Sequence, residues 1–413
     1  MTTVLTAPGD GRRPAGAGFW RWLPLAVAAL IWLALLGLSL VPEWRAWWRG
    51  CFPRIPELPF FDWEVLRRGW AASLAGEDPL RAAALPFDYP RLVLAVAEFG
   101  LRIPTAAAGL LTAAAGLGSL VWILWPRSRG QAVLAAGLLG SLPVLLLAET
   151  GSLDAWAFGL VAVGMVALTK EPLRWPGLGG GGLALVGAML LKLFPAVIFP
   201  AVALFWRGPR RVLGAAGFAI WVVWFVTSLE DVLLILQKSA RVFEPAYGRI
   251  VGVARFYAEV ISAPPRAGGG SAALGLLLDA SFLTGIAGFV VAAWLGWRWR
   301  ERFAALAAGL QDRALFWSGA LIYGGTFFLG NNRSDRLVFL ALCVPLLWRA
   351  VEATEVRRWG MAGLIGIAIL FGSTLPLPLG LFMAQQAVAW LLAWLLFSIA
   401  VAFLAADKDE GDR

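Results

Sequence analysis

The sequence predicts an all-α polytopic membrane protein, and three observations support this prediction. Of its 413 residues, 60% are apolar and only 15% are charged, whereas a soluble chain is usually about 45–50% apolar and about 25% charged. The mean hydropathy is +0.75. The apolar residues form long runs that cover nearly the whole chain, so they leave no room for a separate soluble domain.

The apolar runs divide the chain into about 12 hydrophobic segments, with a range of about 11–13. The first run, at about 19–41, follows a polar tail at 1–18 and lacks a small-residue cleavage site, so we interpret it as an uncleaved signal anchor. The single transmembrane domain is expected to span 19–406, with a second tail at 407–413. Further runs lie near 103–125, 131–148, 153–169, 177–206, 212–228, 272–297, 314–330, 335–349, 359–377 and 382–404.

The run at 177–206 is long for one span and is interrupted at Lys192 and Pro195. One continuous helix would put the arginines at 207–211 on the opposite side of the membrane from the basic residues at 170–174. Two short helices meeting at Lys192 put both clusters on the same side, as the positive-inside rule prefers. We therefore expect a break at Lys192.

This topology places both termini in the cytoplasm and the protein in the cell (inner) membrane. Two long extracytoplasmic loops, at about 42–102 and 229–271, are expected to carry short interfacial helices. Long loops next to a membrane and on one face are a natural place for a site, so we expect an extracytoplasmic active site.

Several absences limit the chemistry. The chain has no histidine, which excludes imidazole bases and histidine metal ligands. Its two cysteines, Cys51 and Cys343, cannot form a disulfide framework. The net charge of +9 comes from basic residues scattered between apolar runs, which is not typical of nucleic-acid binding. No cofactor or metal site is predicted, and dependence on a divalent metal stays open.

Two acidic residues are candidates in the first half. Asp62 lies just before an expected interfacial helix in the first loop, where it is either a functional carboxylate or an N-cap. Asp154 lies just inside a span at the turn 149–154. A carboxylate there is costly unless it faces a cavity or a partner, although Asp154 could equally be a cap.

Two cations are candidates in the apolar runs. Lys192, flanked by apolar residues and followed by Pro195, must reach the surface or meet an anion. Arg336 begins a span after a polar turn, where its guanidinium could hold a phosphate. The alternative for Arg336 is an ion pair with Asp335 or with Asp154. In the second loop, a basic amphipathic segment that includes Arg255 is typical of a binder of anionic headgroups or of a mobile lid.

The order of these motifs resembles the GT-C class of glycosyltransferases, most closely glycosyltransferase family 87, over roughly residues 20–350. The members are mannosyltransferases that use polyprenyl-phosphate mannose. The chain differs at Ser152, where members often have Asn-x-Asp, and at Asp335, where they often have an aromatic residue. The matching motifs are Asp62, Gly76-Glu77-Asp78-Pro79, Phe87-Asp88-Tyr89-Pro90, Gly151-Ser152-Leu153-Asp154, Lys192-Leu193-Phe194-Pro195 and Gly330-Asn331 through Arg336-Leu337.

This resemblance implies a GT-C fold that moves a hexose, mannose in most members, from a polyprenyl-monophosphate donor to a glycan or glycolipid acceptor. Asp62 corresponds to the general base, and Lys192 and Arg336 to holders of the lipid phosphate. Sugar or acceptor contacts are expected from Asp154, Tyr89, Asn331 and Arg255. A single base with direct displacement predicts inversion. Two alternatives remain: a transporter or flippase of a lipid-linked or anionic substrate, and a polymerase or ligase that uses a diphosphate-linked donor.

Overall fold

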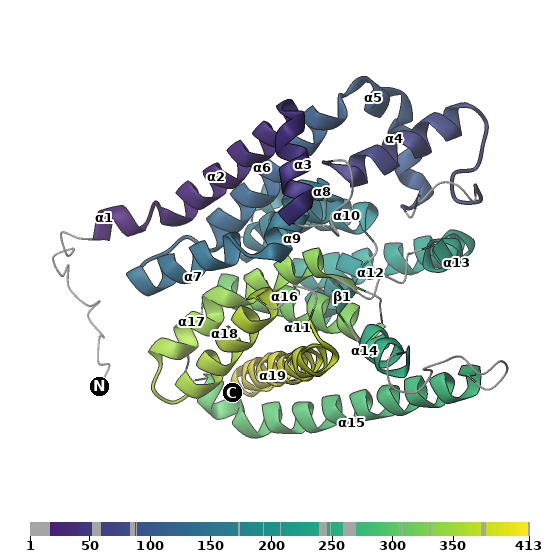
Figure 1. Ribbon diagram of the computed structural model, residues 1–413. Coiled ribbons are helices and arrows are strands. Elements are labelled where there is room, and N and C mark those ends of the chain that lie inside the picture. The colour runs from purple at the N-terminus through teal and green to yellow at the C-terminus, as the bar shows by residue number, and fades with distance from the viewer. Residues whose placement is uncertain are drawn as a thin grey trace, which may run out of the picture.

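The computed structural model of the chain is almost wholly helical (Figure 1). It describes residues 17–51, 59–82, 87, 89–171, 174–192, 194–206, 208–238, 246–247, 249–258, 270–304, 306, 309–329, 332–372 and 377–411. Of the predicted site residues, Asn331 lies outside these ranges, as does Asp88 of the family motifs.

The elements up to residue 191 lie in the upper part of the molecule in Figure 1, and the next helices, up to residue 227, lie nearer its middle. Several begin or end at residues suited to the position: Ser128 caps α7 by accepting from the N–H of Gln131, and Gly151 ends α8 at φ 62°. The elements are α1 (Ala17–Trp20), α2 (Leu23–Leu40), α3 (Pro42–Cys51), α4 (Phe61–Leu74), η1 (Arg91–Val96), α5 (Ala97–Arg102), α6 (Thr105–Ile123), α7 (Arg129–Leu139), α8 (Leu142–Thr150), α9 (Leu153–Thr169), α10 (Trp175–Leu191), η2 (Phe194–Val197), α11 (Ile198–Phe205) and α12 (Pro209–Thr227).

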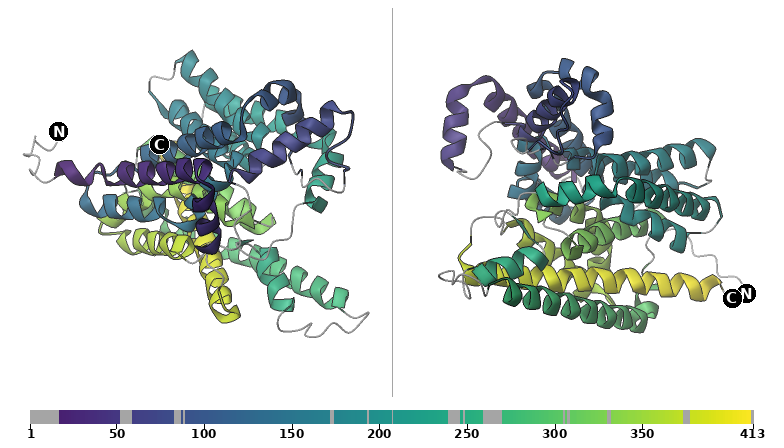
Figure 2. Two further views of the ribbon diagram at one scale, coloured as in Figure 1. Left: turned by 45° about the horizontal axis from the view of Figure 1, so that its top comes forward. Right: turned by 90° about the vertical axis from the view of Figure 1, so that its right-hand side faces the viewer.

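Among the remaining elements, α15 lies along α19 in the right-hand view of Figure 2. Glycines allow this close approach: a Cβ on Gly288 would lie 2.2 Å from the Trp394 ring, and one on Gly296 would lie 2.3 Å from the Ser398 carbonyl oxygen. The elements are α13 (Leu229–Lys238), β1 (Ala246–Tyr247), α14 (Arg249–Phe256), α15 (Gly270–Ala304), α16 (Leu310–Leu329), β2 (Asn332–Arg333), η4 (Ser334–Cys343), α17 (Val344–Glu352), α18 (Arg357–Gly372) and α19 (Leu379–Gly411).

Five of the described helices are long and apolar enough to cross a membrane: Gly18–Leu40, Thr105–Ile123, Pro209–Thr227, Ala273–Phe303 and Leu379–Ala406. The pair α7 and α8, bent by 50°, would make a sixth. Large apolar side chains on α12 and α15 face outward, for example Val223 and Val290, each 64% exposed. Such surfaces suit contact with lipid tails, so the fold is compatible with a polytopic membrane protein.

The chain breaks at Lys192, as the sequence predicts. Helix α10 ends at Leu191, Lys192 has extended backbone at φ −145° and ψ 137°, and η2 begins at Phe194. A guanidinium nitrogen of Arg210 lies 3.3 Å from the Lys170 carbonyl oxygen and donates to it. The two basic clusters that flank the 177–206 run therefore lie at the same end of the bundle, which agrees with two short segments.

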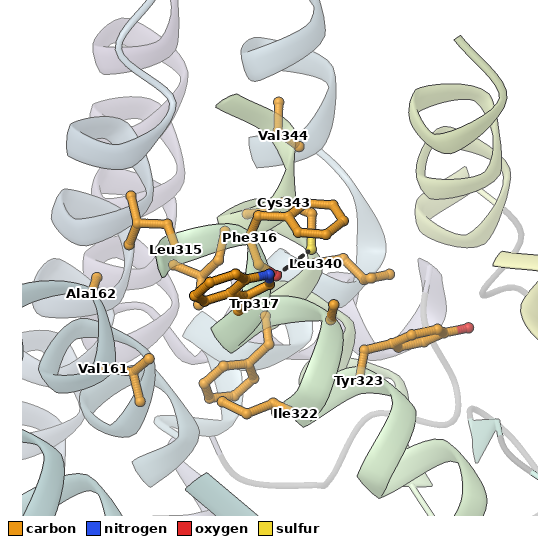
Figure 3. Packing of buried hydrophobic residues seen from close by; sticks show 14 of the residues in the cluster. Val161, Ala162, Leu315, Phe316, Trp317, Ile322, Tyr323, Leu340, Cys343 and Val344 are labelled. Atoms are coloured by element: carbon orange, nitrogen blue, oxygen red, sulfur yellow. Dashed lines mark hydrogen bonds between the residues drawn. The ribbon is translucent and has the colours of Figure 1, made fainter. Parts of the chain in front are cut away.

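The core lies where α9, α16 and η4 meet (Figure 3). Phe316 and Leu340 are fully buried there, with Val161 and Ala162 opposite them. Cys343 is a buried free cysteine whose Sγ donates to the Phe316 carbonyl oxygen at 3.5 Å. Cys343 therefore packs as a small apolar residue.

Ion pairs join the first loop to α13. Arg91 lies 2.5 Å from a carboxylate oxygen of Asp78 and also pairs with Asp231, while Arg81 lies 2.5 Å from a carboxylate oxygen of Glu230. Burial raises the pKa of Asp78. The hydrogen bonds from Arg91 and from the Leu80 N–H, together with the charges of Arg91 and Arg81, more than offset this effect, so the pKa of Asp78 is lowered overall.

The second loop contacts a different part of the chain, because its strand β1 pairs antiparallel with β2, just before η4.

Candidate functional site

Three predicted residues meet at one point of the structure. The Lys192 Nζ lies 3.5 Å from one carboxylate oxygen of Asp154, and the Arg336 Nε lies 3.4 Å from the other. Asp154 is held at the start of α9, where its N–H donates to the Ser152 hydroxyl at 3.3 Å. Thus the break after α10, the start of α9 and the 3-10 helix η4 each supply one charged side chain.

Aromatic rings complete this group. The Lys192 ammonium lies 4.4 Å from the centroid of the Tyr89 ring, and the Arg336 guanidinium lies 5.1 Å from that of Phe194. Both distances are within the range of a cation–π interaction. We call Asp154, Lys192, Arg336, Tyr89 and Phe194 the Asp154 cluster.

The charged side chains of the Asp154 cluster differ in how far they are exposed to solvent. The Asp154 side chain is 2% exposed, whereas those of Lys192 and Arg336 are 14% and 26% exposed. Two cations and one carboxylate have a formal charge of 2 − 1 = +1. A buried carboxylate therefore holds two cations whose outer parts reach solvent, which suits the binding of an anion such as a phosphate.

Asp62 lies in the first turn of α4 and is 5% exposed. It is not the N-cap, as one sequence interpretation had it: the N-cap is Phe60, in the left-handed conformation at φ 60° and ψ 40°. The Phe60 N–H donates to the Glu149 carbonyl oxygen at 2.7 Å, and its ring occupies the space that a Cβ on Gly109 would need. Tertiary contacts therefore decide where the helix begins.

The face of α4 that carries Asp62 packs toward the Asp154 cluster. Val65 and Leu66, three and four residues after Asp62, share its face and are buried in one apolar group with Tyr89 and Leu153. Tyr89 belongs to the Asp154 cluster, and Leu153 directly precedes Asp154. The helix face that carries Asp62 and the Asp154 cluster therefore pack against the same apolar group.

Arg255 lies in a different place. A guanidinium nitrogen of Arg255 donates to the Leu377 carbonyl oxygen at 2.9 Å, and the group lies 4.3 Å from the centroid of the Phe382 ring. These contacts hold α14 against the start of α19. A role of Arg255 toward a sugar or acceptor stays a prediction.

Sequence reasoning missed Thr112 of α6. Its hydroxyl accepts from the indole N–H of Trp63 at 3.0 Å and of Trp156 at 2.9 Å, and itself donates to the Ala108 carbonyl oxygen at 2.9 Å. The residue therefore connects α4 with α9, the helices of Asp62 and Asp154. A lone threonine in an apolar run has no signal that distinguishes this role from ordinary helix packing.

Comparisons with protein-family models, curated proteins and solved structures find no match to this chain. Within the described ranges, no group of three or more acidic or cysteine side chains could hold a metal ion. The site is thus described by its own geometry: an ion cluster of one carboxylate and two cations, lined by aromatic rings, with the buried Asp62 on a helix that packs against the same apolar group.

Proposed function

We propose that this chain is a GT-C-type membrane glycosyltransferase with about 12 hydrophobic segments, both termini in the cytoplasm of a cell (inner) membrane and an extracytoplasmic active site. It moves a hexose, mannose by resemblance, from a polyprenyl-monophosphate donor to a glycan or glycolipid acceptor. The observation that carries this proposal is the Asp154 cluster. Its two cations, positioned on one buried carboxylate, can bind the donor phosphate and stabilise it as it leaves.

The reaction balances as one displacement. The acceptor hydroxyl oxygen forms a bond to the anomeric carbon, the bond from that carbon to the phosphate oxygen breaks, and the electron pair leaves with the phosphate. Lys192 and Arg336 stabilise the charge that develops on the phosphate, while Asp62 accepts the hydroxyl proton. Attack from the side opposite the phosphate inverts the anomeric carbon and converts a β-phosphate donor into an α-linked product.

The test is transfer of labelled sugar from polyprenyl-phosphate mannose by purified protein in liposomes. Asp62→Asn should lower kcat by about 10²- to 10⁴-fold, the usual contribution of a general base. Lys192→Gln and Arg336→Gln should each lower transfer as well, because they remove a phosphate contact. Arg302→Gln changes an exposed arginine on α15 and is the control. Full activity of Asp62→Asn would contradict the assigned base.

A flippase for a lipid-linked or anionic substrate is the second candidate, because the same two cations could bind a headgroup without chemistry. Headgroup translocation in the liposomes without a new glycosidic product would favour it. Trying monophosphate and diphosphate donors in parallel separates the third alternative, since a polymerase or ligase of diphosphate-linked glycans requires the latter.

A further inference from the structure

A cavity of about 220 Å³ lies at the far end of the bundle from the Asp154 cluster. Helix α6 runs between the two, because Gly109 near its start lies beside Gly151, three residues before Asp154, whereas Trp122 and Ile123 at its end line the cavity. With 19 residues, α6 is about 28 Å long at 1.5 Å per residue. One water needs only about 10–15 Å³, so the cavity has room for a group of several heavy atoms.

The polar lining of this cavity contains charges of both signs. Asp312 pairs with Arg349 inside it, and both Arg127 and Glu352 also line it. The formal charge of these four side chains is therefore 2 − 2 = 0. Gln131 and Gln311, which also line the cavity, each contribute an amide that can both donate and accept.

Besides the Asp312–Arg349 pair, two exposed charged residues, Arg127 and Glu352, line the cavity. Arg127 begins the segment before α7, where its N–H donates to the Gln131 side-chain oxygen at 2.6 Å. Glu352 ends α17 and accepts from the Trp348 indole N–H at 2.9 Å. The cavity thus offers a guanidinium for an anionic group and a carboxylate for a cationic group.

The aromatic residues indicate where the ligand comes from. Trp122 and Trp125, which line the cavity, remain 45% and 43% exposed. Trp122 lies in the last turn of α6, one of the helices able to cross a membrane, and Trp125 lies two residues after its end. Tryptophan is enriched where a membrane protein meets the headgroup layer, so the mouth of the cavity faces the depth at which lipid headgroups lie.

We propose that this cavity binds a zwitterionic phosphate–ammonium group, supplied by the headgroup of a phosphatidylethanolamine-type lipid. Arg127 contacts the phosphate, and Glu352 and the glutamine amide oxygens accept from the ammonium. A primary ammonium is assigned because carboxylate and amide oxygens accept hydrogen bonds from N–H groups. A purely anionic headgroup would leave Glu352 without a cation and facing a like charge.

The experiment is native mass spectrometry of the full chain, released from micelles with equal amounts of phosphatidylethanolamine, phosphatidylcholine and phosphatidylglycerol. We expect the ethanolamine lipid to be retained about tenfold more strongly than either of the others, corresponding to about 1.4 kcal/mol. Arg127→Gln and Glu352→Gln should each remove most of this preference. Both side chains are exposed, so neither change threatens the fold, and circular dichroism checks this.

The matched controls are Arg302→Gln and Glu355→Gln, exposed residues outside the lining of the cavity. Both should keep the preference of the unchanged protein. Equal retention of the three lipids, or loss of preference in neither lining variant, would overturn the proposal. Soluble phosphoethanolamine that displaces the lipid at equal concentration would assign the cavity to a free phosphoamine and overturn the lipid source.

Discussion

Replacing Asp154 with asparagine would remove the charge that both Lys192 and Arg336 contact while keeping the size of the side chain. Breaking a fully buried ion pair costs about 3–5 kcal/mol, because the remaining charge stays buried without compensation. The two cations here are 14% and 26% exposed, so water offsets part of that cost. We expect Asp154→Asn to lower the free energy of unfolding by about 2–3 kcal/mol.

A second substitution tests the origin of this cost. Lys192→Met removes one of the two cations but keeps a long apolar side chain of similar length. If the loss in Asp154→Asn comes from cations left without their carboxylate, the double variant should be more stable than the sum of the single effects by about 1 kcal/mol. Interaction energies of this size are typical of charges in direct contact.

The assay is unfolding in mixed micelles at increasing denaturing detergent, followed by tryptophan fluorescence. The control is Glu301→Gln, whose side chain is 86% exposed and pairs with Arg300 at the surface, so it should cost less than about 0.5 kcal/mol. Two results would refute the reasoning: Asp154→Asn as stable as the control, or strictly additive effects in the double variant.

Three further predictions follow from described contacts. Gly109→Ala should cost about 1–3 kcal/mol and reduce sugar transfer, because its Cβ would lie 2.0 Å from a Phe60 ring carbon; Gly118→Ala, with no atom within 4 Å, is the control for both measurements. Burial raises the pKa of Asp78 but its arginine partners lower it overall, so its stabilisation is present above about pH 4 and is lost at lower pH; the difference in thermal midpoint between the unchanged protein and Asp78→Asn should shrink as the pH falls below that value. Tyr89→Leu should destabilise the chain by about 0.5–2 kcal/mol through loss of the ring beneath the lysine ammonium, whereas Tyr89→Phe should cost less in the same unfolding assay.

The break at Lys192 was predictable because its signals are local. A lysine inside an apolar run must meet an anion or reach water, and Pro195 cannot continue the helix. The partner was predictable only as one of two alternatives for Arg336, and the structure has the pair with Asp154. Sequence order alone does not select between them: Asp335 is the chain neighbour of Arg336, whereas the approach of Asp154 depends on how α9 packs against η4.

The interpretation of Asp62 as the N-cap of α4, one of the two that the sequence left open, was wrong because the cause of the helix start is distant in sequence. Asp62 is a good N-cap by its own propensity, yet Phe60 takes that position through contacts with Gly109 and Glu149. The ion pairs between the first loop and α13 were not predicted for the same reason: Arg81 and Glu230, for example, are 149 residues apart. Such pairings depend on how the helices pack against one another. The spacing of apolar residues along the chain does not specify that packing.

In the proposed topology, the break at Lys192 also determines on which side of the membrane each later segment begins. An unbroken helix over 177–206 would be one crossing segment in place of two and would invert every later segment relative to the membrane. Arg336 would then enter from the opposite face and could not reach Asp154. The break at Lys192 therefore sets how many times the 177–206 run crosses the membrane in this topology, and Arg336 can meet Asp154 only when that number is even.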